Sequence, residues 1–465
     1  MRLSGEILLI SCYELGHQPL HLATLQSLLN RAGYLPLPVD TALETLNDEA
    51  IAGARFVALS VPMHTALRLG EQVARRIRER NPQAFICLYG LYALLNADYL
   101  LQNTIIDAAL GGEYEEPLLA LINALERGDA QPSTPGVKTR WRESGPWMQR
   151  APVVLPDRAR LPTLARYAHL EMDGEAVLAG YSETTRGCKH TCRHCPITPV
   201  YHGRFFAFPA EIVLSDIRAQ VAQGARHITF GDPDFFNGPT HAMRIVRALH
   251  QEFPTLTFDA TIKIEHLLMH QRLLPELREL GCAFVVSAVE SLNGDVLMHL
   301  AKDHSRDDVV RAFALMAEAG IPLRPSLLPF SPWETLESYL DLLTFFEEHH
   351  LIEHVDPVHF SIRLLLPPGS SLLETPEEKP WLGELDAAAY TYRWRHPDPR
   401  MDSLQREIAA LVEQAQVSRQ QPVVTFFQIK ALALQACGRL ANTARARKRY
   451  GQGKVLPHLS ESWFC

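Results

Sequence analysis

Three cysteines lie close together in the segment RGCKHTCRHCPI, at Cys188, Cys192 and Cys195. Three thiolates on one short loop can close around one face of an iron–sulfur cube, because thiolates are soft, charged donors. A cube has four irons, so three cysteines leave one iron open to another ligand. The chain has eight cysteines in 465 residues, and the clustering of three indicates a metal or cluster site rather than a disulfide framework.

Other chemistry is compatible with the same loop. Zinc can take the three thiolates with His190 or His194 as the fourth ligand, since zinc prefers four nitrogen and sulfur ligands. Such a site would belong to a zinc-binding interaction protein. Arg186, Lys189 and Arg193 surround the loop, and their charge favours thiolates and tunes the potential of a cluster.

The spacing Cys-x3-Cys-x2-Cys, which follows Arg-Gly at the end of an expected strand, resembles the radical S-adenosylmethionine (SAM) superfamily. The resemblance implies a [4Fe–4S] cluster whose open iron chelates the amino and carboxylate groups of SAM. It also implies reductive cleavage of a carbon–sulfur bond of SAM, with a flavodoxin- or ferredoxin-type protein as electron donor. A non-catalytic iron–sulfur sensor that only binds SAM is the alternative without turnover.

Two later segments carry residues that the resemblance assigns to SAM. GDPDFFNGP follows the second expected barrel strand, so Gly231 and Asp232 fall where the superfamily binds the SAM amino group through the backbone. Lys263 ends the third strand and is a candidate partner of the SAM carboxylate. An ordinary acidic turn and a surface lysine are the structural alternatives.

Polar residues at the ends of the last strands complete the expected site. Ser287 and Glu290, in the segment SAVES, are candidates for the ribose hydroxyls. Arg324 and Arg363 are candidate site residues that would bind a carboxylate or an anionic substrate. The structural alternative for Glu290 is a pair with a neighbouring arginine, and each arginine has a structural alternative as well.

Composition limits the class of partner. Hydrophobic residues make up 47% and charged residues 21% of the chain, as in a globular protein with full cores. The net charge of −8 argues against a nucleic-acid backbone as the main partner. No window reaches the length of a membrane span, and the apolar run 7–10 is too short for a signal peptide. We therefore expect a cytoplasmic protein that acts on a small molecule.

The first section, 1–130, alternates strand and helix patterns and predicts a doubly wound, flavodoxin-like α/β domain with a parallel sheet. The loops at the carboxyl ends of its strands are expected to bind a ligand. The expected strands are 6–12, 56–61, 84–90 and 108–112, and the expected helices are 22–32, 67–79 and 116–127.

Three further sections follow. Residues 131–178 are rich in proline, lack a sustained period and predict a linker. Residues 179–368 resume the alternation and predict a partial (β/α)6 barrel with its chemistry at the strand carboxyl ends. Residues 369–465 predict a helical section with a basic run at 445–449 and a cysteine-ended tail. The expected barrel strands after the cysteine loop are 227–232, 257–263, 284–290, 321–330 and 358–366, and the expected C-terminal helices are 404–417 and 424–439.

The first section resembles the cobalamin-binding domain that precedes many radical SAM barrels. The matching segments are YELGHQP, VPMHTALRL, YGLYALLNA and GGEYEEP. That fold often carries Asp-x-His-x-x-Gly to supply a lower histidine ligand, and this chain has no such motif. The resemblance makes cobalamin a candidate cofactor and makes His17 and His64 candidates for contact with its corrin ring. The alternative for both is a loop histidine with a structural partner.

Nearly the whole chain resembles a narrower group, the CUAEP/CCAEP-tail radical SAM proteins. The resemblance rests on the segments named above, on WRHPDPR and on the final SESWFC. Members end in Cys, then Cys or selenocysteine, then Ala-Glu-Pro, and this sequence stops at Cys465, where that tail begins. The resemblance implies that Cys465 ligates the open iron, quenches a radical or holds a thiophilic substrate. One hypothesis is that the native tail continues through a selenocysteine codon.

One activity known in this neighbourhood assembles an arsenic analogue of glutamate, as in arsinothricin biosynthesis. It passes the 3-amino-3-carboxypropyl group of SAM to inorganic arsenic. The resemblance therefore implies, first, such a transfer to a small substrate. The main alternative is a cobalamin-dependent methyltransferase of natural-product biosynthesis.

Overall fold

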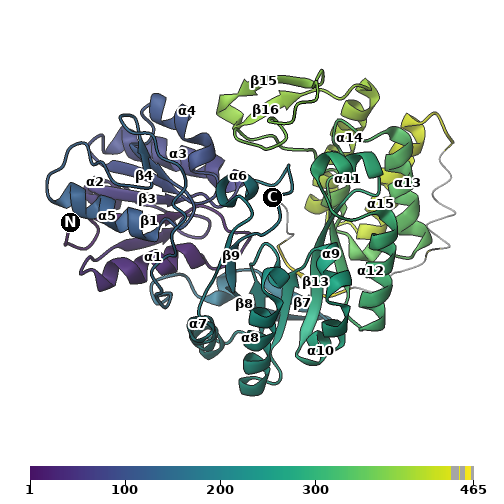
Figure 1. Ribbon diagram of the computed structural model, residues 1–465, viewed down its shortest axis with the longest axis horizontal. Helices are drawn as coiled ribbons and strands as arrows, with labels where there is room; N and C mark the ends of the chain where they lie inside the picture. The colour runs from purple at the N-terminus through teal and green to yellow at the C-terminus, as the bar shows by residue number, and fades with distance from the viewer. Residues whose placement is uncertain (441–449, 451–455, 462–465) are drawn as a thin grey trace.

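The computed structural model describes residues 1–440, 450 and 456–461. Two α/β units lie side by side, and a helical section packs on the outer side of the second unit (Figure 1). The basic run at 445–449 and Cys465 lie outside the described residues.

The N-terminal unit is built on β1 (Ile7–Ser11), β2 (Leu37–Asp40), β3 (Phe56–Ser60), β4 (Phe85–Tyr89), β5 (Ala108–Leu110) and β6 (Val137–Thr139). These strands form one sheet in the order β2-β1-β3-β4-β5-β6, parallel except for β6. The order β2-β1-β3-β4-β5 is that of flavodoxin-like sheets, whose ligands lie at the carboxyl ends of the strands. The predicted doubly wound fold is therefore confirmed. Its helices are α1 (Leu20–Arg31), α2 (Asp48–Gly53), α3 (His64–Arg80), α4 (Ala97–Gln102) and α5 (Glu115–Glu126).

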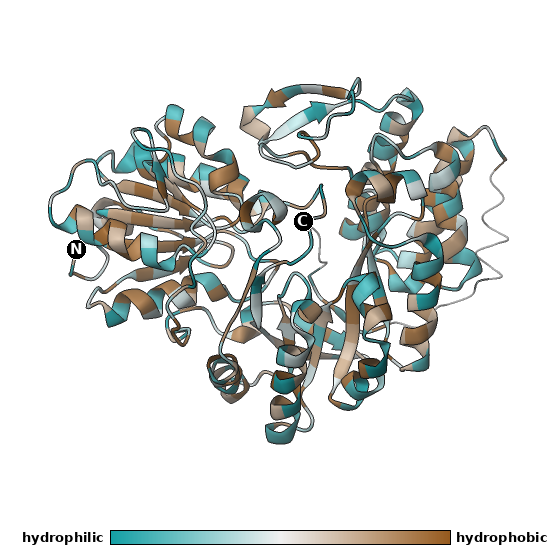
Figure 2. Ribbon diagram, viewed as in Figure 1, coloured by the Kyte–Doolittle hydropathy of each residue, from teal (hydrophilic) through white to brown (hydrophobic). Residues whose placement is uncertain are grey.

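Burial explains why some of these strands were predictable. Strands β1 and β3 are buried along their whole length, because helices cover both faces of a doubly wound sheet. Figure 2 shows hydrophobic strands enclosed by helices with hydrophilic outer faces. The unpredicted β2 is short and contains Pro38, and it lies at the sheet edge, where a proline is tolerated.

The second unit is a curled sheet of β7 (His169–Met172), β8 (Glu175–Ser182), β11 (His227–Phe230), β12 (Thr257–Thr261), β13 (Cys282–Glu290), β14 (Leu323–Leu327) and β17 (His458–Leu459). The order is β14-β13-β12-β11-β8-β7-β17, and the run from β8 to β14 is parallel. This parallel run is the predicted partial barrel. The helices along it are α7 (Ala210–Ala222), α8 (Pro239–Glu252), α9 (Ile264–Met269), α10 (Leu274–Glu279), α11 (Gly294–Leu300), α12 (Arg306–Glu318) and α13 (Leu336–Glu348).

The sixth barrel strand, expected at 358–366, is not formed. Residues Pro357–Phe360 make a 3-10 turn, and the sheet continues only as an isolated bridge between Phe330 and Arg363. The Tyr339 hydroxyl on α13 donates to the carbonyl oxygen of Phe360 at 2.8 Å. This carbonyl therefore bonds to a helix side chain and not to a neighbouring strand. The prediction of six βα units is wrong in this respect.

The segment 131–178, predicted as a linker, contributes β6 to the first sheet and β7 to the second. Between them, the buried Arg158 ties the segment to its surroundings. Its guanidinium donates to Asp216 on α7 at 2.7 and 2.9 Å, to Gln18 Oε1 at 3.0 Å and to the Tyr181 carbonyl at 2.8 Å. The segment is therefore an integral part of both units.

The C-terminal section is helical, as predicted, and it also contains a hairpin. Helices α14 (Pro399–Val417) and α15 (Pro422–Ala436) pack against each other, and β15 (Leu382–Asp386) pairs with β16 (Thr391–Trp394). The hairpin reaches the first unit, where the Tyr390 hydroxyl donates to Glu71 at 2.5 Å. None of the described helices is long and apolar enough to cross a membrane.

Candidate active site

The carboxyl ends of both parallel sheets face one cavity with a volume of about 470 Å³. The N-terminal unit contributes a largely apolar wall that includes Leu15, Met63, Leu91 and Tyr92. The barrel contributes the cysteine loop and the ends of its parallel strands. Strand carboxyl ends are where both kinds of sheet bind ligands, so we call this space the central cavity.

Close backbone packing shapes the start of the cysteine loop. The loop follows the short β9 (Thr185–Gly187), which pairs with β10 (Phe205–Ala207). Gly187 has a φ of 81°, and a Cβ there would lie 2.5 Å from the Tyr201 ring and 2.6 Å from the Arg204 carbonyl oxygen. Only glycine combines this φ with this close approach.

Two side chains hold the loop from outside. The Asn237 side chain accepts from the Lys189 amide at 3.1 Å and donates to the Gly187 carbonyl at 3.2 Å. The hydroxyl of Thr198, the first residue of α6 (Thr198–Tyr201), donates to the Cys192 carbonyl at 2.8 Å. Side chains of the protein therefore hold the loop backbone in place without a metal.

All three cysteines line the central cavity. Burial raises the pKa of the Cys188 thiol to about 11 and that of Cys195 to about 12. These two thiols are therefore neutral at pH 7 unless a bound cation stabilises the thiolates. A loop with such a donor set fits a group that brings its own positive charge, such as iron.

The spread of the sulfur atoms argues against a single zinc ion. Among the described residues, His190, Glu265 and His266 offer ligand atoms within 4.8 Å of one another, whereas the three cysteine sulfurs form no such group. Zinc at about 2.3 Å from each sulfur would hold the sulfurs about 4 Å apart. Both loop histidines, His190 and His194, contact carboxylates. The wider face of an iron–sulfur cube suits these thiols better.

Asp232 lies just beyond β11 and is 1% exposed. Its carboxylate accepts from the Thr184 amide at 2.8 Å and from the hydroxyls of Thr184 and Thr185, both at 2.6 Å. Burial raises the pKa of Asp232 to about 7 although these donors oppose the shift. The side chain holds the strand that leads into the cysteine loop.

The neighbouring Gly231 packs under an aromatic pair. A Cβ on Gly231 would overlap the Tyr181 hydroxyl. His17, from the N-terminal unit, stacks on the Tyr181 ring with centroids 4.7 Å apart. Burial lowers the pKa of His17 to about 4, so the imidazole is neutral at pH 7. The loop at 13–19 therefore reaches the barrel strands, and His17 has a structural partner within the cavity wall.

Lys263 lies on the cavity wall and belongs to a charged network. Its ammonium is 2.9 Å from Glu265, which is also 3.0 Å from His190 Nδ1. His190 Nε2 is 3.3 Å from Asp234, which is 2.6 Å from His266. Burial opposes ionisation of both carboxyls, but contacts with His190 prevail and hold the pKa of Asp234 and Glu265 at about 2. The network ties the middle of the cysteine loop to the end of β12.

Glu290 also lies on the cavity wall, at the end of β13. Its Oε1 is 3.0 Å from the Lys302 ammonium and 3.3 Å from His194 Nε2. Burial opposes ionisation, but Lys302 and His194 hold the pKa of Glu290 well below its usual range. One oxygen of this carboxylate is therefore already engaged, which limits the predicted role with the ribose.

Both predicted arginines line the cavity and both have protein partners. Arg324 donates to Asp356 at 2.8 Å. Arg363 donates to Asp402 at 2.5 Å and to the Trp394 carbonyl at 2.8 Å, and it lies 3.5 Å from the centroid of the Trp394 ring. Arg363 is thus largely occupied in joining α14 and the hairpin to the barrel.

Among the described residues, Ser287 and His64 are the predicted site residues that do not line the cavity. Ser287 is fully buried and does not line the cavity; it is separated from Glu290 by three positions, and alternation along a strand sends such residues to opposite faces. His64 Nε2 lies 2.9 Å from the Ala389 carbonyl in the hairpin. Cys465 lies outside the described residues.

A buried ion cluster between the units was not predicted. Arg186, which directly precedes Gly187, donates to Glu115 at 2.7 Å and lies 3.6 Å from Glu113. Both glutamates belong to GGEYEEP, so the acidic character of that segment was the available signal. Burial raises the pKa of Glu113 to about 7. Lys302 and Asp259 also line the cavity, and neither belongs to a motif named in the sequence.

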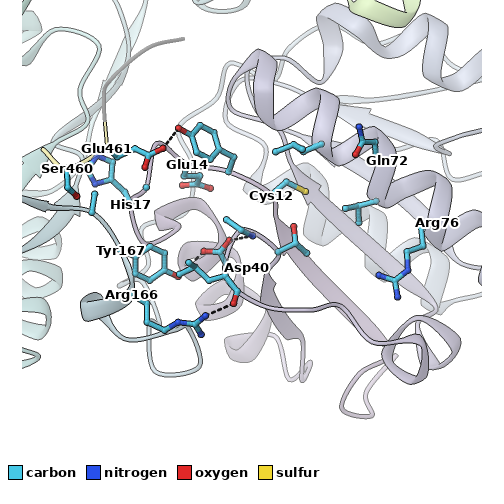
Figure 3. Close-up of a pocket in the computed structure, with 18 residues that line it drawn as sticks. Cys12, Glu14, His17, Asp40, Gln72, Arg76, Arg166, Tyr167, Ser460 and Glu461 are labelled. Carbon is cyan, nitrogen blue, oxygen red and sulfur yellow. Dashed lines mark hydrogen bonds between the residues drawn. The ribbon is translucent and has the colours of Figure 1, made fainter. Parts of the chain in front are cut away.

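A second cavity, of about 690 Å³, lies at the carboxyl ends of β1 and β2 (Figure 3). The Tyr167 hydroxyl donates to Asp40 at 2.9 Å on its wall. Glu461, which accepts from the Tyr13 hydroxyl at 2.6 Å, lies where this cavity approaches the central one. The two cavities share Glu14, His17 and Glu461 as lining residues.

Comparison with known proteins identifies the barrel. Residues 182–344 match the model of the radical SAM superfamily, and this segment is a radical SAM domain. The ribosomal protein uS12 methylthiotransferase RimO of Geobacter sulfurreducens is 24% identical over 190 residues, which are 38% of this chain and 41% of that protein. The match therefore spans about two fifths of the curated relative.

Solved structures share the fold of both units. The radical SAM methyltransferase TsrM of Kitasatospora setae, with tryptophan and a SAM analogue bound, has a TM-score of 0.65 at 15% identity, covering 88% of this chain and 89% of its own. The cobalamin-dependent SAM radical enzyme OxsB, with aqua-cobalamin bound, has a TM-score of 0.67 at 15% identity, covering 92% and 72%. Another TsrM structure contains cobalamin and a [4Fe–4S] cluster, with a TM-score of 0.59 at 17% identity over 74% and 70%. At such identities the likeness concerns the fold.

Proposed function

We propose that this chain is a radical SAM transferase that cleaves SAM at a [4Fe–4S] cluster held by Cys188, Cys192 and Cys195. The observation that carries the proposal is the position of three thiols, two buried and one half-buried, on one fixed loop at the carboxyl end of a curled parallel sheet. When bound, the cluster supplies the electron that breaks a carbon–sulfur bond of SAM.

Other residues of the cavity are suited to bind SAM and to keep water from a reactive carbon centre. Lys263 offers positive charge on the wall for the SAM carboxylate, as the resemblance implies. Apolar side chains such as Met63, Tyr92 and Val286 keep water away from the reacting groups. Electrons come from a flavodoxin- or ferredoxin-type donor.

Anaerobic reconstitution tests the cluster. We expect about four irons and four sulfides per chain, with loss of both in C188A, C192A and C195A. Cys437, which is half-buried and away from the loop, provides the matched control C437A, which should retain the cluster. Zinc without iron or sulfide in the wild-type protein would contradict the proposal.

For the reaction itself, we propose transfer of the 3-amino-3-carboxypropyl group to a small substrate such as inorganic arsenic. The support is the tail resemblance together with the described segment 456–461, in which His458, Leu459 and Glu461 line the central cavity. Cys465 is four positions beyond Glu461, and a chain of that length can span at most about 14 Å. A thiolate is a soft ligand that suits thiophilic arsenic.

Cobalamin-dependent methyl transfer is the second candidate. It is favoured by the apolar wall that the N-terminal unit turns to the cysteine loop, and by the adjoining second cavity. Both features suit a large, flat ligand with a polar extension. His64 Nε2 is engaged with the Ala389 carbonyl, so we propose that His64 does not supply a lower ligand to a corrin.

The SAM-derived product separates these reactions. Methylthioadenosine indicates aminocarboxypropyl transfer, S-adenosylhomocysteine indicates methylation, and 5′-deoxyadenosine indicates hydrogen abstraction. Near-stoichiometric corrinoid absorption after anaerobic purification with cobalamin would favour methyl transfer. Absence of any SAM cleavage by the reduced, fully loaded protein would leave only a sensor.

A further inference from the structure

Lys302 and Glu290 form a buried ion pair beside the second half of the cysteine loop. Their charged atoms are 3.0 Å apart, and their side chains are 3% and 11% exposed. Both residues line the central cavity together with Cys192 and Cys195. An ammonium in so little water acts on neighbouring charges much more strongly than a surface lysine does.

The same part of the loop is docked on the elements that carry this pair. The Arg193 amide donates to the carbonyl of Leu300, the last residue of α11, at 3.0 Å. His194 Nε2 is 3.3 Å from Glu290. The segment from Cys192 to Cys195 is therefore held between the end of β13 and the turn after α11.

Unfavourable backbone conformations accompany this arrangement. Glu290 has a φ of 65° and follows a register shift after Ala288 in the pairing of β13 with β14. Ala301 has a φ of 52° and ends α11, directly before Lys302. Residues other than glycine seldom adopt this region, and such strain persists where the surroundings demand it, often at functional sites. Here it accompanies the approach of both charged side chains to the loop.

We propose that Lys302 is a positioning residue whose ammonium, oriented by Glu290, offsets the negative charge of the Cys192 and Cys195 thiolates and raises the reduction potential of the bound cluster. This inference rests on the proposed function, in which the loop holds a cluster. Reduction adds one electron from the external donor, and a nearby buried cation stabilises the added charge.

The electrostatic environment of Lys302 supports this role. The Glu290 carboxylate, 3.0 Å from the ammonium, stabilises the charged form of Lys302 in this buried position. Glu290 occupies part of the hydrogen-bonding capacity of the ammonium, which has three N–H donors. Glu290 therefore keeps Lys302 charged and fixes the position of its ammonium.

Opposite charge changes test the proposal. Removing the ammonium in K302M leaves Glu290 uncompensated, so the midpoint potential should become more negative. At the wild-type midpoint, the ratio of reduced to oxidised cluster should fall about tenfold, which is 59 mV for one electron. Removing the carboxylate in E290Q leaves Lys302 uncompensated, so the potential should become more positive. K302R keeps the charge and should stay near the wild-type value.

The readouts are a redox titration followed by electron paramagnetic resonance, and iron and sulfide content. The matched control is K430M, because Lys430 forms a similar pair with Glu347 at 2.5 Å between α15 and α13; its potential should be unchanged. Shifts of the same sign in K302M and E290Q, or no shift with a full cluster, would overturn the proposal. If K302M fails to hold iron, E290Q decides by the sign of its shift. Failure of the proposed function is distinct, because the wild-type protein itself would then hold no cluster.

Discussion

The packing behind the cysteine loop depends on the absence of a side chain at Gly231. Gly231 supports the Tyr181 ring, and His17 from the other unit stacks on that ring. The carboxylate of Asp232, the next residue, accepts hydrogen bonds from Thr184 and Thr185. A change of one methyl group at this point therefore affects both α/β units.

The first prediction concerns this packing. G231A places a methyl group on the Tyr181 hydroxyl, and overpacking of this kind costs about 1–3 kcal/mol. We expect a lower midpoint of thermal unfolding. The control is G238A, whose added Cβ would meet its nearest neighbour at 3.7 Å. Equal midpoints for the two variants would contradict the expected clash.

The second prediction concerns acid stability. His17 has a folded-state pKa of about 4, below the ordinary value of 6.5. The unfolded chain therefore binds the proton first, so the stability that His17 contributes is full above pH 6.5 and is lost as pH falls toward 4. When the pH falls from 7.5 to 5, both proteins should lose unfolding free energy. The loss in H17Q should be about 2 kcal/mol smaller than the loss in the wild type.

Urea unfolding of the cluster-free protein at the two pH values measures this difference. H349Q, at an exposed position at the end of α13, serves as the control and should match the wild type. An H17Q variant that loses stability as steeply as the wild type would show that another group dominates.

At the scale of elements, local pattern and long-range contact contribute differently. Strands such as β1 are continuous apolar runs, so the sequence predicts them well. Residues 358–366 have the same strand-like composition, yet Phe360 packs on Phe346 and Phe426 in helices α13 and α15. No local pattern distinguishes these outcomes.

The candidate site likewise contains residues that local spacing identified and residues that only tertiary contacts bring together. The cysteine spacing is local, and it identified the loop. Lys302 approaches that loop only because α11 ends beside it, through a contact from Arg193 to Leu300. Ser287 and Glu290 are three positions apart on β13, so alternation along the strand places only Glu290 on the cavity wall. Contacts formed by tertiary packing leave no spacing signal in a single sequence.

The third prediction belongs to the segment 131–178. Arg158 and Asp216 are each 2% exposed in their side chains and form a two-point ion pair. R158M leaves Asp216 buried without its partner, which should destabilise the protein by about 3–5 kcal/mol. Denaturant unfolding measures the loss, and R158M combined with D216L should recover part of it.

The exposed pair of Arg218 and Glu252 supplies the comparison, since water already solvates both groups. R218M should leave the unfolding midpoint nearly unchanged. Similar losses in R218M and R158M would contradict the claim that burial, and not ion pairing alone, gives Arg158 its importance.

At the scale of the whole molecule, the central cavity is bounded by parts of the chain that are far apart in sequence. The N-terminal sheet, the barrel and the segment 456–461 all contribute to its wall. Strand β17 is held by pairing with β7, and Leu459 packs against the buried cluster formed by Leu170, Val177, Ala283 and Phe284. The last described segment therefore contributes to the enclosure of the site.

The fourth prediction tests that enclosure. L459D places a charge against this buried apolar cluster, which should detach β17 and cost about 1–3 kcal/mol. With the wall opened, the reconstituted cluster should bleach faster in air, as followed by its visible absorbance. V417D, at a side chain that is 84% exposed, should bleach at the wild-type rate. Equal rates for both variants would show that β17 does not shield the cavity.

The place of β17 in the chain also orders events during biosynthesis. A ribosome releases the cysteine loop and the parallel strands long before it releases His458 and Leu459, and domains generally fold as they emerge. The nascent barrel thus presents its thiols while the sheet edge at β7 is still unpaired. Delivery of iron and sulfide therefore has an interval of open access, which ends when β17 pairs with β7.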